Sequence, residues 1–517
     1  MNRPRAAARR DHTGIEDRLG RHWPVWVFGL FLYGMIGLFL LTKVRIPTPL
    51  HLLVMVMALT VLSVTAIRLE WSILALALIL FFARPGISLG AGSAFHVSGF
   101  EFALLGVTLA YVLRYLVDKD FAAKGPPIRR TIMDWPLLTF AMLVTFSSLA
   151  SFSLNEDNAV ARAMTASSMK TQLLFVLWFY LLSTLLRTPS DLRRFVVFFG
   201  IAGLIVSGTG LAQRLMGGGA AITAGTVGEN LEAGAGGRLH GGWLGLDHPN
   251  MFAALLVMSM PIWFFMVSHL RHGIRRLFAE FAVVIGFLGL LFTYSRSAWL
   301  GSAAGLGLLG LMDRASLKRL VIFSIVFVIA AQGLALFMTN MNLVDVVVGR
   351  IEEFQSSDFS ARPSIYRSAF VLIREHPWTG VGLSTFWFHA PPIGLGFVPK
   401  HAHNVFLNYA AEAGIPAALV LVTIFGMAMV LSVRSVRRVG RLPGYGFLAL
   451  GICAALIGLL AQMMAVQIFR QSLLGYGIYA LLAIIVALDR MIREGQFDDI
   501  REQTAPESGE GGVWISS

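Results

Sequence analysis

The sequence predicts an all-α, polytopic membrane protein with about 14 transmembrane helices (12–14). Of its 517 residues, 56% are hydrophobic and only 14% are charged. A soluble domain carries about 25% charged residues, so the class of soluble globular proteins is excluded. Apolar runs of about 20 residues recur along the chain, and that length is typical of membrane-spanning helices rather than of membrane β-strands.

The N-terminal residues 1–22 carry six arginines and lead into the first apolar run. This run fills a whole span and is followed by no small-residue cleavage site, so we expect an uncleaved first helix rather than a signal peptide. The single cysteine, Cys453, excludes a disulfide within the chain. The net charge of +13 is interpreted as an orientation signal and lipid-headgroup contact, not as nucleic-acid binding.

Fourteen apolar segments follow one another along the chain. The third is shortened by Arg84 and Pro85. In order, the segments are 23–42, 49–67, 71–90, 99–117, 135–153, 171–187, 195–213, 250–268, 277–294, 297–312, 320–339, 414–433, 446–467 and 472–489.

The distribution of Lys and Arg predicts the orientation of these helices. When the N-terminus is placed in the cytoplasm and the spans alternate, most of the 42 Lys and Arg residues fall in cytoplasmic segments, as the positive-inside rule requires. Both termini are then cytoplasmic, and the acidic, Gly- and Ser-rich tail 490–517 is expected to be disordered. The small residues from Gly301 to Gly310 indicate close packing between helices.

This topology divides the chain into five parts. A cytoplasmic arm precedes eleven helices, which include one long extracytoplasmic loop; a second and larger extracytoplasmic loop separates these helices from the last three, and a tail follows. The parts are 1–22, 23–339 (with the loop 214–249), 340–413, 414–489 and 490–517.

Arg296 is the first candidate site residue. It lies in FTYSRSAWLG, in a loop of only two or three residues between two apolar spans, so its guanidinium must lie near the outer headgroup level. One reading is an arginine that reaches lipid phosphate. The other is an anion-binding residue, because a guanidinium offers paired donors that match a phosphate group.

His403 and Asn404 stand where the large outer loop meets the next apolar segment, in VPKHAHNVFLNYAAEAGIP. A histidine accepts a proton near neutral pH, and nearby arginines favour the neutral imidazole that a general base needs. A packed interfacial histidine is the alternative. His401 lies two residues away, but His-Ala-His is not a helical ligand pair, so no metal site is predicted.

Arg238 and Arg367 are further outer-face arginines. Arg238 stands in GRLHGGWLGLDHPN before a span, where the alternative is a salt bridge to one of Glu229, Glu232 or Asp247; Arg367 stands in RPSIYRSAF in the large loop. Trp378, Trp387 and Phe388 in the same loop are candidates for stacking on sugar rings, with packing as the alternative.

Three stretches in this order resemble one family. YSRSAW after an apolar span, REHPWTGVG in a large outer loop, and HAHNVFLNYAAEAGIP together resemble the O-antigen ligase and Wzy-type polysaccharide polymerase superfamily. The ligase pattern is His, then Asn, Ser or Gln, then nine further residues and Gly, and here His403 and Asn404 are followed by nine residues and Gly414. Its last element, Gly, Thr or Tyr, is Ala417 in this chain. RLHGGWLGLDHPNMFA resembles the family's arginine before Pro-Asn.

The resemblance implies a membrane glycosyltransferase with a GT-C-like helical bundle, in the bacterial inner membrane, with its site facing the periplasm. The donor is then a glycan on undecaprenyl diphosphate, and the reaction inverts the anomeric carbon and uses no metal or other cofactor. His403 is the expected base, Arg296 and Arg238 the diphosphate ligands, and Arg367 and Arg214 further phosphate ligands. Asn404 and His401 are supporting residues.

Three functions remain open. A polymerase, favoured by Ala417 and by the span count, joins lipid-linked repeats in exopolysaccharide or O-antigen synthesis. A ligase transfers the finished glycan to lipid A–core, the last step in lipopolysaccharide assembly, or to a protein. In each case the partners are lipid-linked oligosaccharide, a glycan or lipid A–core acceptor, membrane lipids and other polysaccharide-assembly proteins. A transporter of lipid-linked oligosaccharide is the third, although no internal repeat or mid-membrane charge favours it.

Overall fold

The computed structural model describes residues 69–80, 86–88, 96–123, 126, 128–215, 249–270, 273–312, 358–392, 398–498 and 500, together with isolated helical positions between 318 and 344. The arm 1–22, the first two predicted spans, most of the loop 214–249 with Arg238, and most of the tail lie outside these residues. All statements below concern the described part of the chain.

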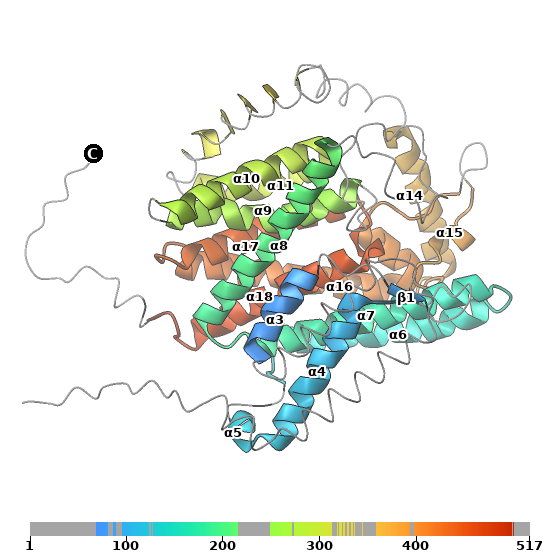
Figure 1. Cartoon of the computed structure of the whole chain (residues 1–517). Helices are drawn as coiled ribbons and strands as arrows, with labels where there is room; N and C mark the ends of the chain where they lie inside the picture. The colour runs from blue at the N-terminus through green and yellow to red at the C-terminus, as the bar shows by residue number, and fades with distance from the viewer. Residues whose placement is uncertain are drawn as a thin grey trace, which may run out of the picture.

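Helices form almost all of the described structure, as the sequence predicted. They run side by side in one bundle, and α14 crosses one end of it (Figure 1). The helices are α3 (Leu69–Ile79), α4 (Gly99–Val117), α5 (Lys119–Ala122), α6 (Asp134–Leu154), α7 (Ala159–Leu185), α8 (Pro189–Leu215), α9 (Pro249–His269), α10 (Ile274–Phe292), α11 (Arg296–Met312), α14 (Asp358–Glu375), α15 (Phe386–His389), α16 (Val405–Val439), α17 (Gly446–Met463), η2 (Ile468–Arg470) and α18 (Ser472–Arg493).

Eight of the described helices are long and apolar enough to cross a membrane: α4, α6, α7, α8, α9, α16, α17 and α18. The chain is therefore a multi-pass membrane protein. The count of 14 spans stays a prediction. The spans predicted at 277–294 and 297–312 correspond to α10 and α11.

Burial separates central from peripheral helices. α9, α17 and α18 are 83% to 94% buried within their apolar windows, whereas α6 is 33% buried. Large apolar side chains such as Leu138, Met142 and Leu419 are exposed on the peripheral helices. In a bundle that spans a membrane, these side chains face lipid, so their exposure needs no other partner.

Three features differ from the predicted segments. Within the span predicted at 71–90, the described residues form α3 up to Ile79, and 86–88 form β1 (Gly86–Ser88), which pairs antiparallel with β2 (His96–Ser98). A strand at 86–88 is compatible with Pro85, because proline disfavours the continuation of a helix. The span predicted to begin at 414 begins at Val405. The last helix continues to Arg493, into the predicted tail.

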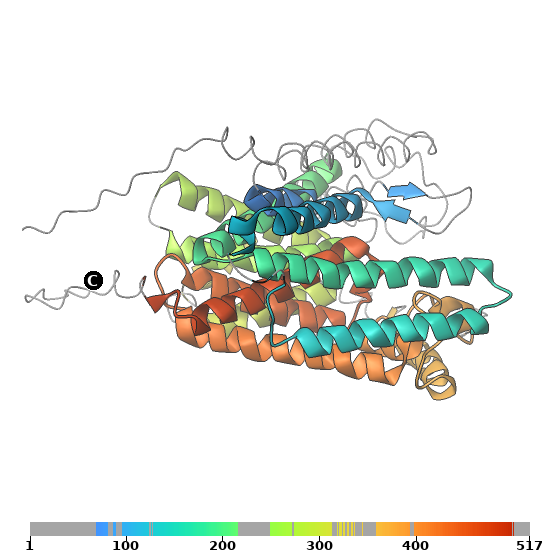
Figure 2. The ribbon, with the colours of Figure 1, turned by 90° about the horizontal axis from the view of Figure 1, so that it is seen from below.

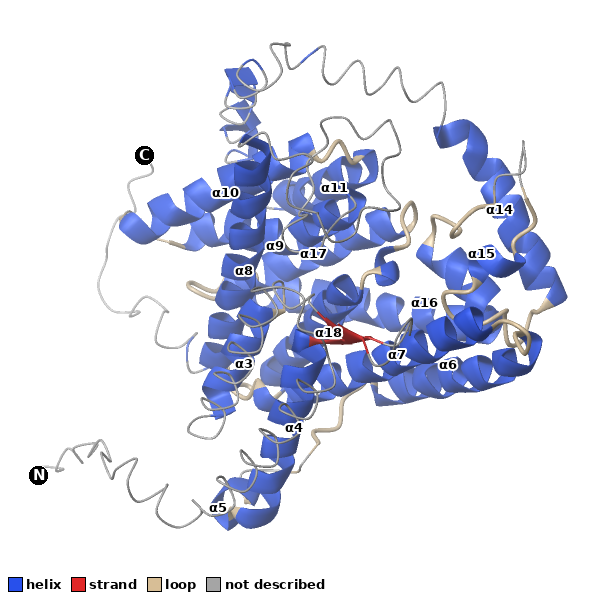
Figure 3. Ribbon diagram, turned by 45° about the vertical axis from the view of Figure 1, so that its right-hand side comes forward, coloured by secondary structure: helices blue, strands red, loops and turns tan. Residues whose placement is uncertain are grey.

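The predicted loop 340–413 contains a helix of 18 residues, α14, and the short helix α15. Buried Ile365, Ala369 and Leu372 are spaced as one face of a helix. Ala369 and Leu372 of this face pack with Phe386, Ala402 and other residues in a small second hydrophobic cluster. Figure 3 shows α14 and α15 at one end of the bundle beside α6. The polar insert is thus a folded unit on the end of the membrane helices.

α6 and α7 form a long antiparallel pair that extends toward this unit, seen in teal in Figure 2. Asn158 begins α7 by accepting a hydrogen bond from the Ala161 amide. Ser98 and Glu101 form a capping box at the start of α4. The Glu101 carboxylate also pairs with Lys170 Nζ at 2.7 Å and accepts from the Tyr476 hydroxyl at 3.2 Å. This buried contact ties α4 to α7 and α18.

Candidate active site

His403 immediately precedes α16 and has a positive φ of 50°. Asn404 is the N-cap of the helix, and its side chain accepts a hydrogen bond from the Leu407 amide at 3.0 Å. The Ala402 amide donates to Asn408 Oδ1 at 3.0 Å, which closes the His-Ala-His turn onto the helix. A left-handed backbone at a non-glycine residue costs about 1 kcal/mol or more, so these contacts hold His403 in a strained position.

The turn brings the rings of His401 and His403 together, with centroids 4.1 Å apart and an interplanar angle of 72°. Both side chains are partly exposed. An edge-to-face contact of this kind restricts the orientation of both rings. The two predicted histidines therefore form one unit at the start of α16.

α16 is sharply kinked nine residues after it starts. Gly414 has φ 87° and ψ 161°, and Pro416 follows. In a regular helix, the carbonyls of Ala411 and Glu412 would accept from the amides of residues 415 and 416. Pro416 has no N–H group, and the Ile415 amide instead donates to the Pro377 carbonyl at 2.8 Å. Two buried carbonyls are thus left for other donors.

The turn after α14 supplies those donors. The Val381 amide donates to the Ala411 carbonyl at 3.0 Å, and the Gly382 amide donates to the Glu412 carbonyl at 2.9 Å. We call residues 377–386 the docked turn. It approaches α16 so closely that a Cβ on Gly414 would lie 2.2 Å from the Trp378 carbonyl oxygen, and a Cβ on Gly380 would lie 2.3 Å from the Glu412 carbonyl carbon. This contact explains why glycine is required at Gly380 in REHPWTGVG and at Gly414 in HAHNVFLNYAAEAGIP.

The Glu412 side chain fixes the same turn. It is buried, and its Oε1 accepts a hydrogen bond from the Phe386 amide at 3.2 Å. The carboxylate therefore caps the start of α15. Sequence reasoning did not single out Glu412, although a carboxylate among apolar residues of a membrane helix is a signal of a specific partner.

Polar side chains of α6 and α7 hold the other side of the docked turn. Ser147 Oγ donates to the carbonyls of Thr379 and Glu412, and Thr165 Oγ1 donates to the Leu383 carbonyl at 3.3 Å. Sequence reasoning missed this surface too. Its signal was the spacing of Ser147, Ser151 and Asn155, every fourth residue on one face of an apolar helix.

Asn155 joins α6 to α15. Its Nδ2 donates to the carbonyls of Ser151 (2.8 Å) and Val381 (3.2 Å), so its Oδ1 faces His389 Nε2 at 2.9 Å. His389 Nε2 must then carry the hydrogen. Burial, and then the neighbouring His376, lower the pKa of His389 below its ordinary value. His389 therefore serves as a neutral donor that holds α15 in place.

Arg296 is the first residue of α11, and residues 293–295 separate it from α10. Its place relative to His403 follows from the packing of α11 on α17. Gly301 lies against Gly458 and Gly305 against Ala454, so the two helices are antiparallel. This register places Arg296 beside residues 462–463, at the end of α17. We call this end of the bundle, where α17 ends and α16 begins, the site end.

His403 lies at the site end as well. The Asn404 Nδ2 donates to the Met464 carbonyl, directly after α17, at 3.3 Å. Gln462 Nε2 donates to the Asn250 carbonyl at the start of α9 at 3.0 Å. The end of α17 is therefore surrounded by the starts of α9, α11 and α16.

The structure says less about the positions of the other predicted arginines, Arg214, Arg238 and Arg367. α8 and α9 are antiparallel, with Gly200 against Trp263 and Gly210 against Phe252, which puts the backbone of Arg214 at the site end. Arg367 lies on α14 and is exposed. Arg238, which precedes α9, is outside the described residues. Of the predicted site residues, the structure brings His401, His403 and Asn404 into one turn and places Arg296 at the same end of the bundle.

The arrangement supports chemistry on an anionic substrate at the membrane surface. An imidazole is a side chain that can transfer a proton, and a guanidinium at the same end of the bundle is one that can bind an anion. A comparison with protein families matches residues 281–422 to the family described as O-antigen ligase. The match begins in α10 and ends within α16, so it includes Arg296, the docked turn, His403 and Gly414. No curated protein matches the chain.

Replacement of Gly414 tests the contact between the kink and the docked turn. Gly414→Ala places a Cβ against the Trp378 carbonyl and requires a positive φ at alanine. We expect a loss of about 2 kcal/mol of stability and faster proteolysis within 376–392. Thermal unfolding and limited proteolysis of the protein in detergent measure both effects.

The matched control is Gly426→Ala in the same helix, where an added Cβ meets nothing within 4 Å. It should leave stability unchanged or raise it slightly, since alanine favours helix. If both variants unfold and are cleaved alike, the kink does not depend on the docked turn.

Proposed function

We propose that this chain, whose residues 281–422 match the O-antigen ligase family, is a glycosyltransferase that moves a glycan from a lipid diphosphate to a sugar hydroxyl. The observation that carries the proposal is the placement of His403 and Arg296 at one end of the bundle, both within the matched region. A transferase of this kind needs a base for the acceptor and cations for the leaving diphosphate.

The proposed site end faces the periplasm. Support comes from the opposite end of the bundle, where α4, α7, α16 and α18 end. Arginines gather there: Arg114, Arg187, Arg434, Arg437, Arg438, Arg490 and Arg493. By the positive-inside rule, that end faces the cytoplasm of the inner membrane. The protein then binds undecaprenyl diphosphate glycans at the outer leaflet, beside the starts of α9, α11 and α16.

In the proposed reaction, the acceptor oxygen attacks the anomeric carbon of the donor sugar. His403 takes the hydroxyl proton as the new glycosidic bond forms. The bond from the anomeric carbon to the diphosphate oxygen breaks, and the electron pair leaves with the diphosphate. Arg296 stabilises the charge that develops there, with Arg214, Arg238 and Arg367 as further phosphate ligands. A single displacement inverts the anomeric carbon, and no step requires a metal ion.

The imidazole needs a fixed direction to act as a base. His401 contacts the His403 ring edge to face, and Asn404 fixes the backbone as the N-cap of α16. The supporting roles proposed for His401 and Asn404 are therefore positional. The docked turn affects the position of His403 indirectly, because it holds the part of α16 between His403 and the kink at Gly414.

A polymerase that joins lipid-linked repeats is the favoured activity, on the count of predicted spans. A ligase that transfers the glycan to lipid A–core or a protein is the second candidate, and the description of the matched family favours it. Ala417, where the ligase pattern has another residue, is fully buried in the core. Its departure from the pattern therefore changes packing and removes no reacting group.

Substitution of His403 and Arg296 tests the proposed roles. With purified protein in vesicles and a lipid-diphosphate glycan donor, His403→Ala should lower transfer by about 10²–10⁴-fold, the usual contribution of a general base. Arg296→Ala should abolish transfer, and Arg296→Lys should restore it only in part, because lysine lacks the paired donors. Unchanged thermal unfolding shows that each variant is folded.

Arg275→Ala is the control, since Arg275 is exposed at the opposite end of the bundle, at the start of α10. It should transfer normally. Near-normal transfer by His403→Ala contradicts the base assignment and directs attention to Asp247 or Glu375. Loss of activity in EDTA that a divalent ion restores contradicts the metal-free mechanism. Donor movement across the vesicle without new glycosidic bonds contradicts the enzyme and indicates the transporter.

Deletion of the gene separates the two enzymatic candidates. A cell that lacks a polymerase should accumulate single repeat units, whereas a cell that lacks a ligase should accumulate long chains on undecaprenyl diphosphate. Gel analysis of the lipid-linked glycans measures their length. Long chains that remain on the carrier contradict the polymerase and support the ligase.

A further inference from the structure

A cavity of about 540 Å³ lies at the end of the bundle opposite to the site end, against the last turns of α16. Its described lining consists of three apolar and three basic residues: Met429, Val430, Val433, Arg434, Arg437 and Arg438. This volume is within the range of pockets that bind small molecules. The residues come from a helix that is long and apolar enough to span a membrane.

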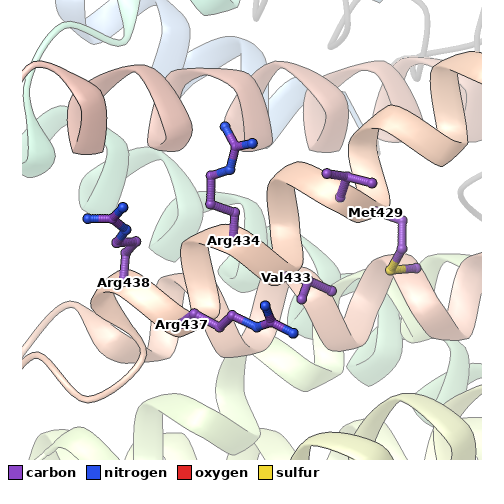
Figure 4. Close-up of a pocket in the computed structure, with 6 residues that line it drawn as sticks. Met429, Val433, Arg434, Arg437 and Arg438 are labelled. Carbon is purple, nitrogen blue, oxygen red and sulfur yellow. The ribbon is translucent and has the colours of Figure 1, made fainter.

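The lining is ordered along the helix. Met429, Val433 and Arg437 are spaced four residues apart, as are Val430, Arg434 and Arg438, so they form two adjacent rows on one face. Figure 4 shows the three arginines nearer the end of α16 and Met429 further back along the helix. Over about 13 Å, the surface changes from apolar to cationic.

The cationic part of the cavity consists of exposed arginines at the end of α16. Arg434 pairs with the buried Asp489 at 3.8 Å, and Asp489 also pairs with Arg493 at 2.8 Å. Arg437 and Arg438 are exposed. Cations are stabilised at the C-terminus of a helix by its dipole, but an anion there must be held by side chains.

We propose that this cavity binds an anionic phospholipid of the inner leaflet. An acyl chain lies along Met429, Val430 and Val433, and the headgroup phosphate is held by Arg437 and Arg438, with Arg434 beside them. A phosphate without an acyl chain leaves the apolar residues Met429, Val430 and Val433 uncovered. The cation of a zwitterionic headgroup balances the phosphate charge and is repelled by the arginines. The ligand that covers both halves is a lipid with net negative charge.

The site is distinct from the glycosyl-transfer chemistry, but the two share α16. His403 precedes the start of this helix, and the lipid binds its last turns, from Met429 to Arg438. Binding therefore stabilises the helix in its spanning position, by mass action on the folded state. The inference does not require the proposed activity, and its test uses no substrate.

The experiment measures lipid binding by the full chain in detergent. Phosphatidylglycerol is added, and native mass spectrometry counts retained lipid while thermal unfolding follows stabilisation. The double variant Arg437→Ala/Arg438→Ala should bind phosphatidylglycerol at least about tenfold more weakly, because charge-assisted hydrogen bonds to phosphate are lost. Arg437→Lys/Arg438→Lys should retain part of the affinity, which shows that the charge and not the fold is responsible.

Arg275→Ala is the matched control, because it removes an exposed arginine at the same end of the bundle but outside the cavity. It should bind phosphatidylglycerol like the unmodified chain. The proposal is overturned if the double variant binds as the control does. It is also overturned if phosphatidylethanolamine binds as tightly as phosphatidylglycerol, or if inorganic phosphate alone gives the same stabilisation.

Discussion

The structure depends on two backbone carbonyls in α16 that the helix itself does not satisfy. Pro416 has no N–H group to give, and the Ile415 amide is turned away at the Gly414 kink, so the carbonyls of Ala411 and Glu412 need donors from elsewhere. Inside a membrane protein an unsatisfied carbonyl costs several kcal/mol, about as much as a marginal fold has in reserve. The docked turn supplies both donors. A helix break of this kind would be destabilising alone, and here it is the point where a polar unit attaches.

These hydrogen bonds determine where the site residues lie. The segment of α16 between His403 and the kink is held by the docked turn on one side and by α6 and α7 on the other, through Ser147 and Thr165. Close packing of glycines places α11 against α17 and sets the level of Arg296. His403 and Arg296 are far apart in the sequence, but both lie at the end of the bundle where α17 ends. The proposed chemistry draws on both of these packing arrangements.

The sequence predicted the parts of this picture that are local. Apolar run length gave the class of protein, and the short turn before Arg296 and the boundary at His403 followed from hydropathy. It predicted the start of a span at Gly414, whereas the helix starts at Val405. Residues 405–413 include the polar residues Asn408 and Glu412, and Asn404 is recognised as a cap only when the helix is known to begin there. α14 was hidden because it lies in a polar stretch and buries only one face.

What the sequence did not predict was contact between distant segments. The α6 serines and the Glu412 carboxylate indicate that polar partners exist, but those partners are 26 to 265 residues away and the sequence does not identify them. The two glycine motifs were recognised by resemblance alone. The structure supplies the physical reason for Gly380 and Gly414, since a Cβ on either would lie within 2.3 Å of a backbone atom of the other motif.

Hydrogen exchange of the chain in lipid nanodiscs tests the central claim most directly. The amides of Val381, Gly382 and Ile415 are the donors that join the docked turn to α16. If the kink is satisfied by this turn, peptides that contain these amides exchange far more slowly than an unfolded peptide of the same sequence. Exchange of the 377–386 segment at the unfolded rate, with α16 still protected, would contradict the account.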